Sequence, residues 1–261
     1  WWQSGSIYQI YPRSFADSNG DGIGDLNGIR NHLDYLVELG VNCIWLSPIF
    51  SSPHADFGYD ISDYYTIDPK FGTMGDFEAL LDEAHRKGLY IILDMVMNHT
   101  SDQHAWFRRA KSSRNDPFHE WYLWGEPSKN GGRPNNWRSV TGGSGWEYAQ
   151  EVERYYFHMF YKQQPDLNWR NPEVQKEMFN IFRFWLDKGV DGYRLDVFNL
   201  LYKDEHLRSN PPKLGFNAFD WQKHIYDLDQ PEIKPLLAKL RIICDEKKGR
   251  YLVGEPFTPE L

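Results

Sequence analysis

Three segments of the sequence end an apolar run with charged or polar side chains: residues 94–99 (DMVMNH), 194–196 (RLD) and 254–255 (GE). Acidic residues commonly cap the loops that follow strands, so one such segment alone carries little information. Three apolar runs that all end this way favour a shared site, because parallel α/β folds place their chemistry at the carboxyl ends of the strands.

Asp196 and Glu255 are the two carboxyl groups with the clearest chemistry. If their strands are neighbours, the backbones lie about 4.7–4.9 Å apart and the carboxyl groups about 5 Å apart, which is the spacing of a retaining glycosidase. Arg194 precedes Asp196 by two residues and points to the same side of the strand, so its charge favours an ionised nucleophile. Glu255 follows Val253 and Gly254 in a less polar setting, which favours the raised pKa of an acid catalyst.

The 261-residue chain is acidic, with 29 Lys and Arg against 37 Asp and Glu and a net charge of −8. This balance argues against nucleic acid and anionic membranes as partners, because both reward basic patches. No apolar run reaches the ~18 residues of a membrane span. Cys43 and Cys244 are too few for a disulfide framework, and we expect two buried free thiols. Aromatic residues make up 16% of the chain, which fits exposed rings for sugars or bases as well as an aromatic core.

The rest of the chain alternates strands with helices. Apolar stripes at helical spacing, ended by glycine, separate short continuous apolar runs. We predict strands at residues 6–11, 43–46, 89–95, 193–197 and 251–254, and helices at 29–39, 73–88, 171–189 and 232–246. This order implies a parallel sheet covered by helices, for which a doubly wound sheet and a (β/α) barrel both fit. No Gly-x-Gly-x-x-Gly or Walker loop follows a strand, so a nucleotide site has no support.

Two stretches lack strong periodicity. Residues 100–168 are rich in Asn, Gly, Pro and Ser and hold five of the eleven tryptophans. A stretch of this length inside a compact protein is typical of a functional insertion. Residues 203–230 are polar and irregular.

These motifs together resemble the α-amylase superfamily of glycoside hydrolases (family 13), in its α-glucosidase and oligo-1,6-glucosidase branch. The resemblance runs over nearly the whole chain. Residues 94–99, 192–196 (GYRLD) and 254–255 look like three signatures of the family. Residues 164–168 (QPDLN) look like the motif that marks the branch, and residues 56–59 (DFGY) like the segment that receives the terminal glucose.

The resemblance implies roles for individual residues. Asp196 would be the nucleophile, and Glu255 the general acid and base, of a double displacement through a glucosyl-enzyme intermediate. Val197 follows the nucleophile, and valine there accompanies cleavage of α-1,6 links in similar enzymes; a β-branched residue in an ordinary strand is the alternative interpretation. The terminal sugar would contact Asp56, Tyr59, His99, Phe160, Gln164, Arg194 and Val197, with Tyr59 stacked on its ring.

The resemblance also implies an α/β fold: a (β/α)8 TIM barrel of which this chain would hold only the N-terminal portion, about strands 1–5. Residues 1–99 would form strands 1–3, residues 100–168 an inserted domain B, and residues 169–261 strands 4–5. Strands 6–8 and a third catalytic Asp would lie beyond residue 261. We therefore expect part of a longer enzyme, which would be poorly soluble and inactive if expressed alone, because an unclosed sheet exposes a free edge.

Residues 17–25 (DSNGDGIGD) form a separate group of oxygen-bearing residues. Oxygen ligands at positions 1, 3 and 5 with glycine at position 6 repeat the start of an EF-hand loop, although position 12 is Gly28 and the bidentate Glu is absent. Related α-glucosidases bind a metal in such a loop, which favours a structural Ca²⁺; a loop of Asx turns without metal is the alternative. The ligands would be Asp17, Asn19, Asp21, Ile23 and Asp25.

The leading hypothesis is a retaining, exo-acting α-glucosidase that hydrolyses short isomalto- or malto-oligosaccharides, with α-1,6 links favoured. A sucrose isomerase or glucosyl transferase would keep the same chemistry, as would a trehalose-6-phosphate hydrolase, which needs a cationic phosphate pocket. A non-catalytic relative, like the heavy subunits of amino-acid transporters, would be membrane-anchored and lack parts of the catalytic set. We expect an oligosaccharide or disaccharide as partner, no organic cofactor, no nucleic acid, no membrane and a cytoplasmic location; the oligomeric state stays open.

Overall fold

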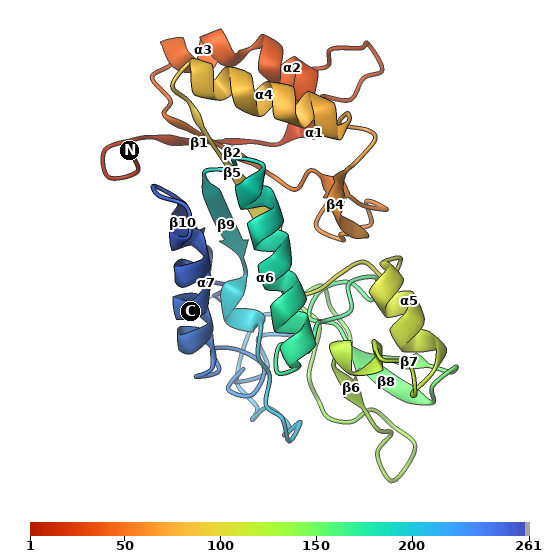
Figure 1. Cartoon of the computed structure of the whole chain (residues 1–261). Coiled ribbons are helices and arrows are strands. Elements are labelled where there is room, and N and C mark those ends of the chain that lie inside the picture. Colours follow the sequence, from red (N-terminus) through yellow and green to blue (C-terminus); the bar gives the residue numbers. More distant parts are fainter. Residues whose placement is uncertain (259–261) are drawn as a thin grey trace.

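Five parallel strands form one sheet in the order β1-β2-β5-β9-β10. The computed structural model describes residues 1–258 (Figure 1). The order in space follows the order in the chain, as in a (β/α) barrel, whereas a doubly wound sheet reverses direction at a switch point. The five predicted barrel strands are therefore confirmed. They are β1 (Ile7–Ile10), β2 (Cys43–Leu46), β5 (Tyr90–Val96), β9 (Gly192–Asp196) and β10 (Tyr251–Gly254).

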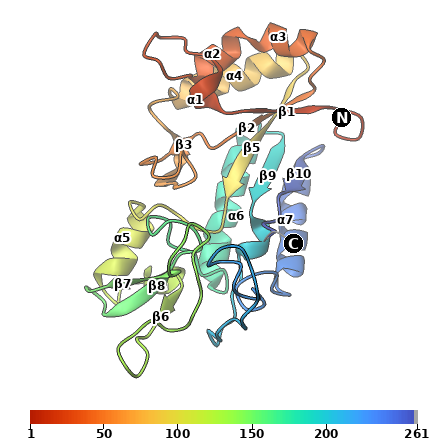
Figure 2. The same ribbon diagram turned by 180° about the vertical axis from the view of Figure 1, so that it is seen from behind.

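Helices connect these strands. Figure 2 shows β5 and β9 in front of α6 when the molecule is seen from behind, so this helix covers the opposite face of the sheet. The helices outside residues 100–168 are α1 (Pro12–Phe15), α2 (Leu26–Asn31), α3 (Leu33–Glu38), α4 (Met74–Arg86), α6 (Pro172–Asp187), α7 (Ile233–Asp245) and the short 3₁₀ helix η2 (Phe198–Leu200).

The long helices begin at the capping residues that the sequence predicts. Thr73 and Asp76 form a reciprocal capping box at the start of α4, with each side chain accepting from the other residue's backbone N–H. Asn171 accepts from the backbone N–H of Glu173 at 2.9 Å at the start of α6, where Pro172 is the first helical residue. The predicted apolar stripe of α6 is buried and includes Val174, Met178, Ile181, Phe182 and Trp185.

The helix predicted over residues 29–39 is wrong in its bounds. It begins earlier, at Leu26, and is interrupted at His32, whose φ of −114° and ψ of 14° leave the helical region. The His32 ring lies 2.8 Å from the carbonyl oxygen of Gly28. In an uninterrupted helix that oxygen accepts from the backbone N–H four residues later, so the imidazole competes with the helix for the same acceptor.

Residues 100–168 form a small unit beside the sheet (Figures 1 and 2). Its three strands pair antiparallel in the order β6-β8-β7. His99 and Asp166 form an isolated antiparallel bridge, so the chain leaves and returns at one place, as an insertion does. The exact domain bounds stay a prediction. The elements are α5 (Ala105–Ser112), η1 (His119–Trp121), β6 (Trp124–Gly125), β7 (Trp146–Ala149) and β8 (Arg154–Phe157).

Two further connections complete the described chain. The strands β3 (Phe50–Ser51) and β4 (Asp63–Ile67) pair antiparallel between β2 and α4. Residues 203–230 contain an isolated bridge and turns in place of helices or longer strands, as their composition predicts.

Most of the aromatic side chains build the core. The largest fully buried side chains are all aromatic, and the tryptophans among them are Trp137, Trp146, Trp169 and Trp185. Exposed sugar-stacking rings therefore account for only part of the aromatic content. The two cysteines are buried and unpaired, as expected, and burial raises the pKa of each thiol to about 12.

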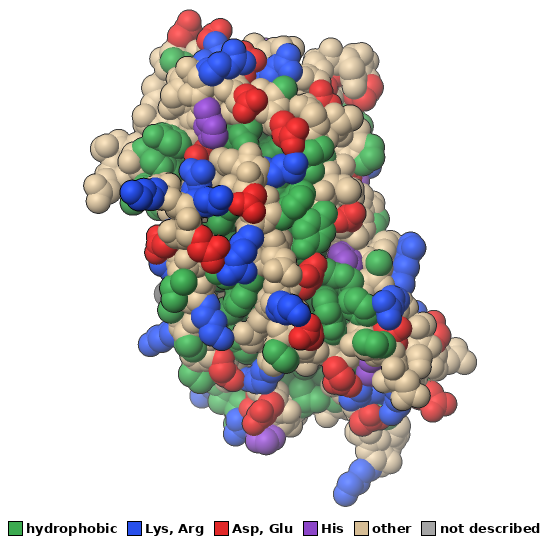
Figure 3. Space-filling view, viewed as in Figure 1, with side chains coloured by type: hydrophobic (Ala, Val, Ile, Leu, Met, Phe, Trp, Pro, Cys, Tyr) green, Lys and Arg blue, Asp and Glu red, His purple; other side chains and the backbone are tan. Residues whose placement is uncertain are grey.

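The surface mixes charges of both signs. Figure 3 shows acidic and basic side chains interspersed over one face of the molecule, without a large field of a single sign there. In the part of the chain that the structure describes, none of the helices has the length and apolar character needed to cross a bilayer.

Candidate active site

The three segments singled out in the sequence lie together at the carboxyl ends of neighbouring strands. β5 pairs with β9, which places Asp94 opposite Arg194 and Val96 opposite Asp196. β9 pairs with β10, and the backbone N–H of Glu255 donates to the carbonyl of Leu195 at 3.0 Å. The strands that carry Asp196 and Glu255 are therefore neighbours, as the spacing argument for a glycosidase requires.

A single guanidinium lies among three carboxylates. Arg194 Nη1 donates to Asp94 Oδ1 at 2.8 Å and to Asp196 Oδ1 at 2.5 Å, while Nη2 forms an ion pair with Glu255. The guanidinium also lies over the indole ring of Trp45, 4.9 Å from the ring centroid. Both predicted catalytic carboxylates are thus held by the same cation.

Burial sets the protonation of these acids more strongly than the arginine does. We predicted that Arg194 lowers the pKa of Asp196, but burial raises that pKa and Arg194 only opposes the shift. The pKa of Asp94 rises to about 7 because of burial and the nearby charge of Asp196, again opposed by Arg194. One cation cannot neutralise three carboxylates, so the site favours retention of a proton.

Glu255 lies in a different setting from the one predicted. Its side chain is 57% exposed and paired with Arg194, whereas the flanking apolar residues indicated a less polar environment. The reason is that Glu255 follows the last residue of β10 at the edge of the described sheet, where Gly254 and Pro256 are themselves exposed.

Four of the predicted sugar-binding residues form one connected group. Gln164 Nε2 donates to Asp56 Oδ2 at 2.9 Å and lies 3.0 Å from His99 Nε2. The rings of His99 and Phe160 meet edge to face with centroids 5.3 Å apart. Burial lowers the pKa of His99 to about 4 and raises the pKa of Asp56, so the imidazole is neutral at physiological pH.

Tyr59 connects this group to the guanidinium. Its hydroxyl donates to Asp94 Oδ2 at 3.3 Å, and the Nε1–H of Trp45 donates to the same oxygen at 3.1 Å. Asp94 therefore accepts from Arg194 on one oxygen and from two aromatic residues on the other. Asp94 therefore helps to fix the position of Arg194, and Tyr59 itself is half-buried.

Val197 lies outside the predicted strand. The strand ends one residue earlier than predicted, because Val197 has a φ of +35° and a ψ of +43°. A β-branched residue rarely occupies this left-handed region, and such strain is concentrated at functional sites. The side chain packs in a buried cluster with Trp137, Phe157 and Phe219. An ordinary strand position, the alternative interpretation of this valine, is therefore excluded.

The structure adds residues that the sequence did not single out. Trp45 contacts both Asp94 and Arg194. Lys203 and Asp166 form a buried ion pair, and both bind Asn98, the residue before His99. Trp45 belongs to an apolar run that predicts only a strand, and Lys203 belongs to an irregular polar stretch. Neither has a spacing signal, because both contacts depend on segments far away in the chain.

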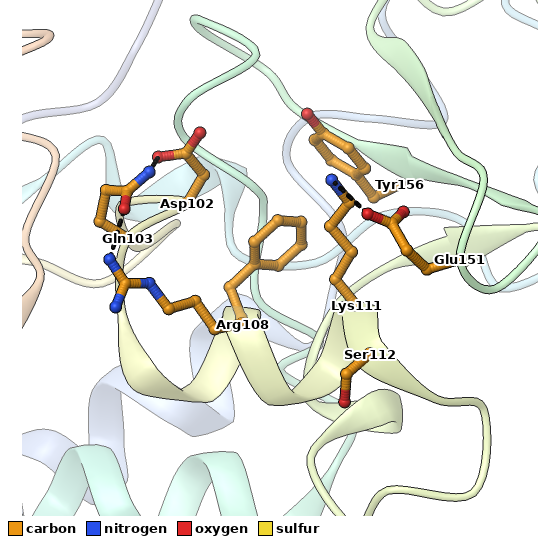
Figure 4. Close-up of a pocket in the computed structure, with 8 residues that line it drawn as sticks. Asp102, Gln103, Arg108, Lys111, Ser112, Glu151 and Tyr156 are labelled. Atoms are coloured by element: carbon orange, nitrogen blue, oxygen red, sulfur yellow. Dashed lines mark hydrogen bonds and ion pairs between the residues drawn. The ribbon is translucent and has the colours of Figure 1, made fainter.

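Two hollows differ in their relation to this site. One of about 440 Å³ lies along the strands of the five-stranded sheet, and Trp45, Arg194 and Glu255 are among its lining residues. Another of about 350 Å³ lies on the insertion, between α5 and the segment that carries Glu151 (Figure 4). Its charged side chains are paired, as in the Lys111–Glu151 ion pair, and no predicted site residue lines it.

The loop predicted to bind Ca²⁺ folds as a series of Asx turns. Asp17 accepts from three backbone N–H groups, and the hydrogen bonds from Gly22 and Gly20 are the main cause of its lowered pKa. Asn19 and Asp21 accept in the same way from residues two positions later. These side chains leave oxygens on the exposed side of the loop, and an all-oxygen set is what Ca²⁺ takes.

Asp25 has a second function in this loop. One of its oxygens caps α2 by accepting from Gly28, and the other accepts from the backbone and hydroxyl of Ser18. Residues 1–258 contain no group of three or more His, Cys, Asp or Glu side chains that could hold a metal ion. A Ca²⁺ here would therefore depend on the amide of Asn19 and the carbonyl of Ile23 as well as on carboxylates.

The profile of the α-amylase catalytic domain matches residues 9–260, which include every strand and carboxylate described above apart from part of β1. The chain belongs to the α-amylase family. The resemblance inferred from the signatures and the partial barrel fold are both confirmed.

Relatives within this family differ in activity. The chain is 53% identical to an oligo-1,6-glucosidase of Parageobacillus thermoglucosidasius and 52% identical to a trehalose-6-phosphate hydrolase of Bacillus subtilis (strain 168), in each case over 98% of the chain. It spans 45% and 44% of their lengths. The crystal structure of the α-glucosyl transfer enzyme XgtA matches 97% of the chain and 49% of its own, with a TM-score of 0.96 and 48% identity.

Proposed function

We propose that these residues belong to a retaining α-glucosidase that hydrolyses terminal α-glucosidic bonds, with α-1,6 links favoured. The observation that carries the proposal is the pair of carboxylates on neighbouring parallel strands, Asp196 and Glu255, held by one guanidinium. Carboxyl groups at the ends of neighbouring strands and paired with one guanidinium support the separation of about 5–5.5 Å that a retaining enzyme needs.

In the proposed reaction, the Asp196 carboxylate attacks the anomeric carbon while protonated Glu255 gives its proton to the leaving oxygen, and the glycosidic bond breaks. A glucosyl ester on Asp196 results. Glu255, now ionised, takes a proton from water, the water oxygen attacks the same carbon, and Asp196 leaves as a carboxylate. The Glu255–Arg194 ion pair must open before Glu255 donates, because a protonated carboxyl has no charge for the guanidinium.

The connected polar group supports recognition of a single terminal glucose. Asp56, Gln164 and His99 form a hydrogen-bonded group, Phe160 contacts the His99 ring, and Tyr59 is half-buried. A small set of polar groups joined to aromatic rings suits one sugar ring better than a long chain. The strained backbone at Val197, directly after the nucleophile, supports a role in shaping the next position, where the α-1,6 preference would be decided.

Trehalose 6-phosphate is the second candidate substrate, and one hollow favours it. Arg133 and Arg138 line a space of about 290 Å³ in the insertion, and the described residues around it include no carboxylate. The next residue, Ser139, donates its hydroxyl to the carbonyl of Phe160 at 2.7 Å, which ties this wall to the predicted sugar pocket. Guanidinium groups bind phosphate well, so this hollow is the candidate for the cationic pocket that such a substrate needs.

Hydrolysis and transfer of glucose differ only in the nucleophile that attacks the glucosyl ester. A sucrose isomerase or transferase would use a sugar hydroxyl in place of water, with the same two carboxylates. A non-catalytic relative would not need the Arg194 arrangement, and this chain retains Asp196, Glu255, Arg194 and His99 together.

A side-by-side assay of isomaltose, maltose, sucrose and trehalose 6-phosphate tests the proposal on the protein that contains this chain. We expect isomaltose to have the highest kcat/KM and Asp196→Asn to abolish hydrolysis of all four. Arg138→Gln should affect only the phosphorylated sugar. An Asp196→Asn variant that hydrolyses any of them at the wild-type rate would contradict the proposal.

We also propose that the loop of residues 17–25 holds a structural Ca²⁺ through Asp17, Asn19, Asp21 and the carbonyl of Ile23. Asp25 would take part with the remaining lone pairs of its two hydrogen-bonded oxygens. The ion would restrain the connection between α1 and α2, far in sequence from the catalytic carboxylates.

A further inference from the structure

The turn that carries two of the predicted sugar contacts has an unfavourable backbone conformation. Residues 52–59, between β3 and β4, include Asp56 and Tyr59. In the same turn His54 has a φ of 62° and Phe57 a φ of 50°. Residues with a side chain adopt such values at a cost, and only where surrounding contacts over-determine the backbone. Other contacts are therefore needed to keep Asp56 and Tyr59 in place.

The buried carboxylate of Asp60 provides contacts of this kind. It is 0% exposed. Its Oδ2 accepts from the backbone N–H of Ala55 at 2.8 Å, and its Oδ1 accepts from the backbone N–H of Asp56 at 2.9 Å and from the hydroxyl of Ser52 at 3.0 Å. Because a carboxylate has two accepting oxygens, it takes donors at both, which an amide of the same shape cannot do.

Asp60 is itself fixed to the core. The next residue, Ile61, is fully buried, and its carbonyl accepts from the backbone N–H of Ser101 at 2.7 Å. Ser101 follows His99 by two residues. Asp60 is therefore tied to the segment that carries another of the predicted sugar contacts.

A second carboxylate holds the beginning of the turn. Asp68 Oδ2 accepts from the backbone N–H of Ser52 at 3.1 Å and lies 3.0 Å from His54 Nε2. These contacts involve residues that precede Ala55 and Asp56. The hydrogen bond to the backbone of Asp56 itself comes from Asp60.

We infer that Asp60 is a positioning residue: its carboxylate holds the backbone of residues 55–56 so that the Asp56 side chain meets Gln164 and the terminal sugar. Gln164 Nε2 donates to Asp56 Oδ2 at 2.9 Å, and the backbone N–H of Tyr59 donates to the Asp56 carbonyl at 2.9 Å. The positions of both predicted sugar contacts thus follow from this backbone. The inference rests on the proposed function for the identity of the ligand; the constraint on the turn is a property of the ligand-free protein.

The charge of Asp60 acts in the opposite direction to its positioning role. Burial raises the pKa of Asp56, the hydrogen bond from Gln164 lowers it, and the negative charge of Asp60 raises it. Removal of that charge would lower the pKa of Asp56 and favour its ionised form, which accepts hydrogen bonds more strongly. Weaker sugar binding in Asp60→Asn would therefore come from lost position and not from altered charge.

Hydrogen exchange of the backbone amides tests the position of the turn without any sugar. Asp60→Asn retains the shape of the side chain but turns an NH2 group toward a backbone donor of residues 55–56. We expect at least tenfold faster amide exchange at these residues in the folded variant. Asp191→Asn removes another buried carboxylate that accepts from a backbone N–H, at the amino ends of the strands. It is the matched control, with wild-type exchange at residues 55–56.

Kinetics of the protein that contains this chain test what the position does. We expect kcat/KM for isomaltose to fall about tenfold or more in Asp60→Asn, because small misplacements of a binding group are costly. The loss should lie chiefly in a higher KM, since Asp56 would contact sugar hydroxyls and not the reacting atoms. Asp191→Asn should keep the wild-type KM and kcat.

Unprotected amides at Ala55 and Asp56 in the wild-type protein would overturn the inference without any variant. A folded Asp60→Asn variant with wild-type exchange, or with a wild-type KM despite faster exchange, would also overturn it. If exchange accelerates while neither protein hydrolyses a sugar, the proposed function fails and the constraint by Asp60 stands. If sugars are hydrolysed and exchange does not respond, the positioning role fails and the proposed function stands.

Discussion

At the scale of single residues, the position of Arg194 connects the acids to which the proposal gives different functions. Its guanidinium contacts Asp94, Asp196 and Glu255, while Trp45 lies beneath it. Burial pushes Asp94 and Asp196 toward the neutral form and the guanidinium pulls both toward the ionised form. A nucleophile must be ionised, so the activity depends on which of these effects prevails.

Removal of this cation is expected to move the acidic limb of the pH profile. In Arg194→Gln the opposing charge is lost, the pKa of Asp196 rises further, and ionised Asp196 forms only at a higher pH. We expect the acidic limb of kcat/KM to move upward by about 1–3 pH units. Arg183→Gln, which breaks a surface pair with Glu246, is the control and should leave the profile unchanged. An unchanged profile in Arg194→Gln would contradict the account.

Val197 is expected to influence the choice of linkage. Val197→Thr keeps the branched shape and Val197→Ala removes it, so the pair separates shape from polarity. We expect the ratio of kcat/KM for isomaltose over maltose to fall about tenfold or more in Val197→Ala, since one or two methyl groups at a packed site discriminate on this scale. Val152→Ala alters a buried valine of the insertion and should leave the ratio intact. A constant ratio in all three variants would exclude a role in specificity.

The sequence predicts site residues that directly follow apolar runs, but it does not indicate the residues that support them. Asp196 and Glu255 stand out because each follows a strand, and Arg194 because of its spacing. Trp45 and Lys203 do not stand out, because their functions arise when β2, β5 and the segment after β9 come together in space.

At the scale of elements, the proposed catalytic groups lie at the carboxyl ends of the strands, and a structural ion cluster lies at their amino ends. Asp191, just before β9, accepts from the backbone N–H of Ile91, from Arg250 at 3.0 Å and from His85 Nε2 at 2.7 Å. This carboxylate therefore joins α4, β5, β9 and the start of β10. These contacts at the amino ends of the strands help to fix the parallel register that brings the proposed catalytic residues together.

Stability should depend on the charge of His85. The hydrogen bond to Asp191 is the main cause of its raised pKa, so the contribution is fully present below the unfolded-state pKa of about 6.5 and is lost as pH rises through the higher folded-state pKa. His85 is 37% exposed, and solvent screening limits the effect to about 0.5 kcal/mol. Urea unfolding should show His85→Gln destabilised at pH 5.5 and equal to wild type at pH 9.

His206→Gln is the matched control for that comparison, because His206 is largely exposed. Equal destabilisation of His85→Gln at both pH values would show that the hydrogen bond, and not the charge, provides the stabilisation.

Strands and helices followed their sequence patterns where local signals agreed with packing. The capping box at Thr73 and the apolar stripe of α6 are examples. The pattern failed at His32, where a side chain took a helix acceptor, and at Val197, where strain ended a strand. The strands of the insertion are two to four residues long, too short for periodicity to reveal them.

At the scale of the whole molecule, the chain provides five neighbouring strands of a barrel and one inserted unit, and it spans about half the length of the curated relatives it matches. The family signatures indicated this arrangement before the structure did. Composition did not indicate where the aromatic residues lie, because the same percentage fits a sugar pocket and an aromatic core.

A bound Ca²⁺ would stabilise the folded molecule as a whole, because the unfolded chain lacks the site. At a free concentration of about 100 times Kd the gain is about 2.7 kcal/mol, which corresponds to a Tm increase of roughly 5 °C. We expect this increase for the wild-type protein, its reversal by a chelator, and its loss in Asp17→Asn with Asp21→Asn. Asp34→Asn, an exposed carboxylate paired with Lys87, should retain the response. A wild-type Tm that ignores both calcium and chelator would exclude the ion.

The central claim is that Asp196 forms a covalent bond to glucose. A fluorinated glucosyl substrate that slows release of the glucosyl group should accumulate this ester on the protein that contains the chain, and peptide mass spectrometry then locates it. The account predicts one added fluoroglucosyl group, on a peptide that includes Asp196. A label on another residue, or steady turnover of the unmodified substrate while no ester accumulates on Asp196, would contradict it.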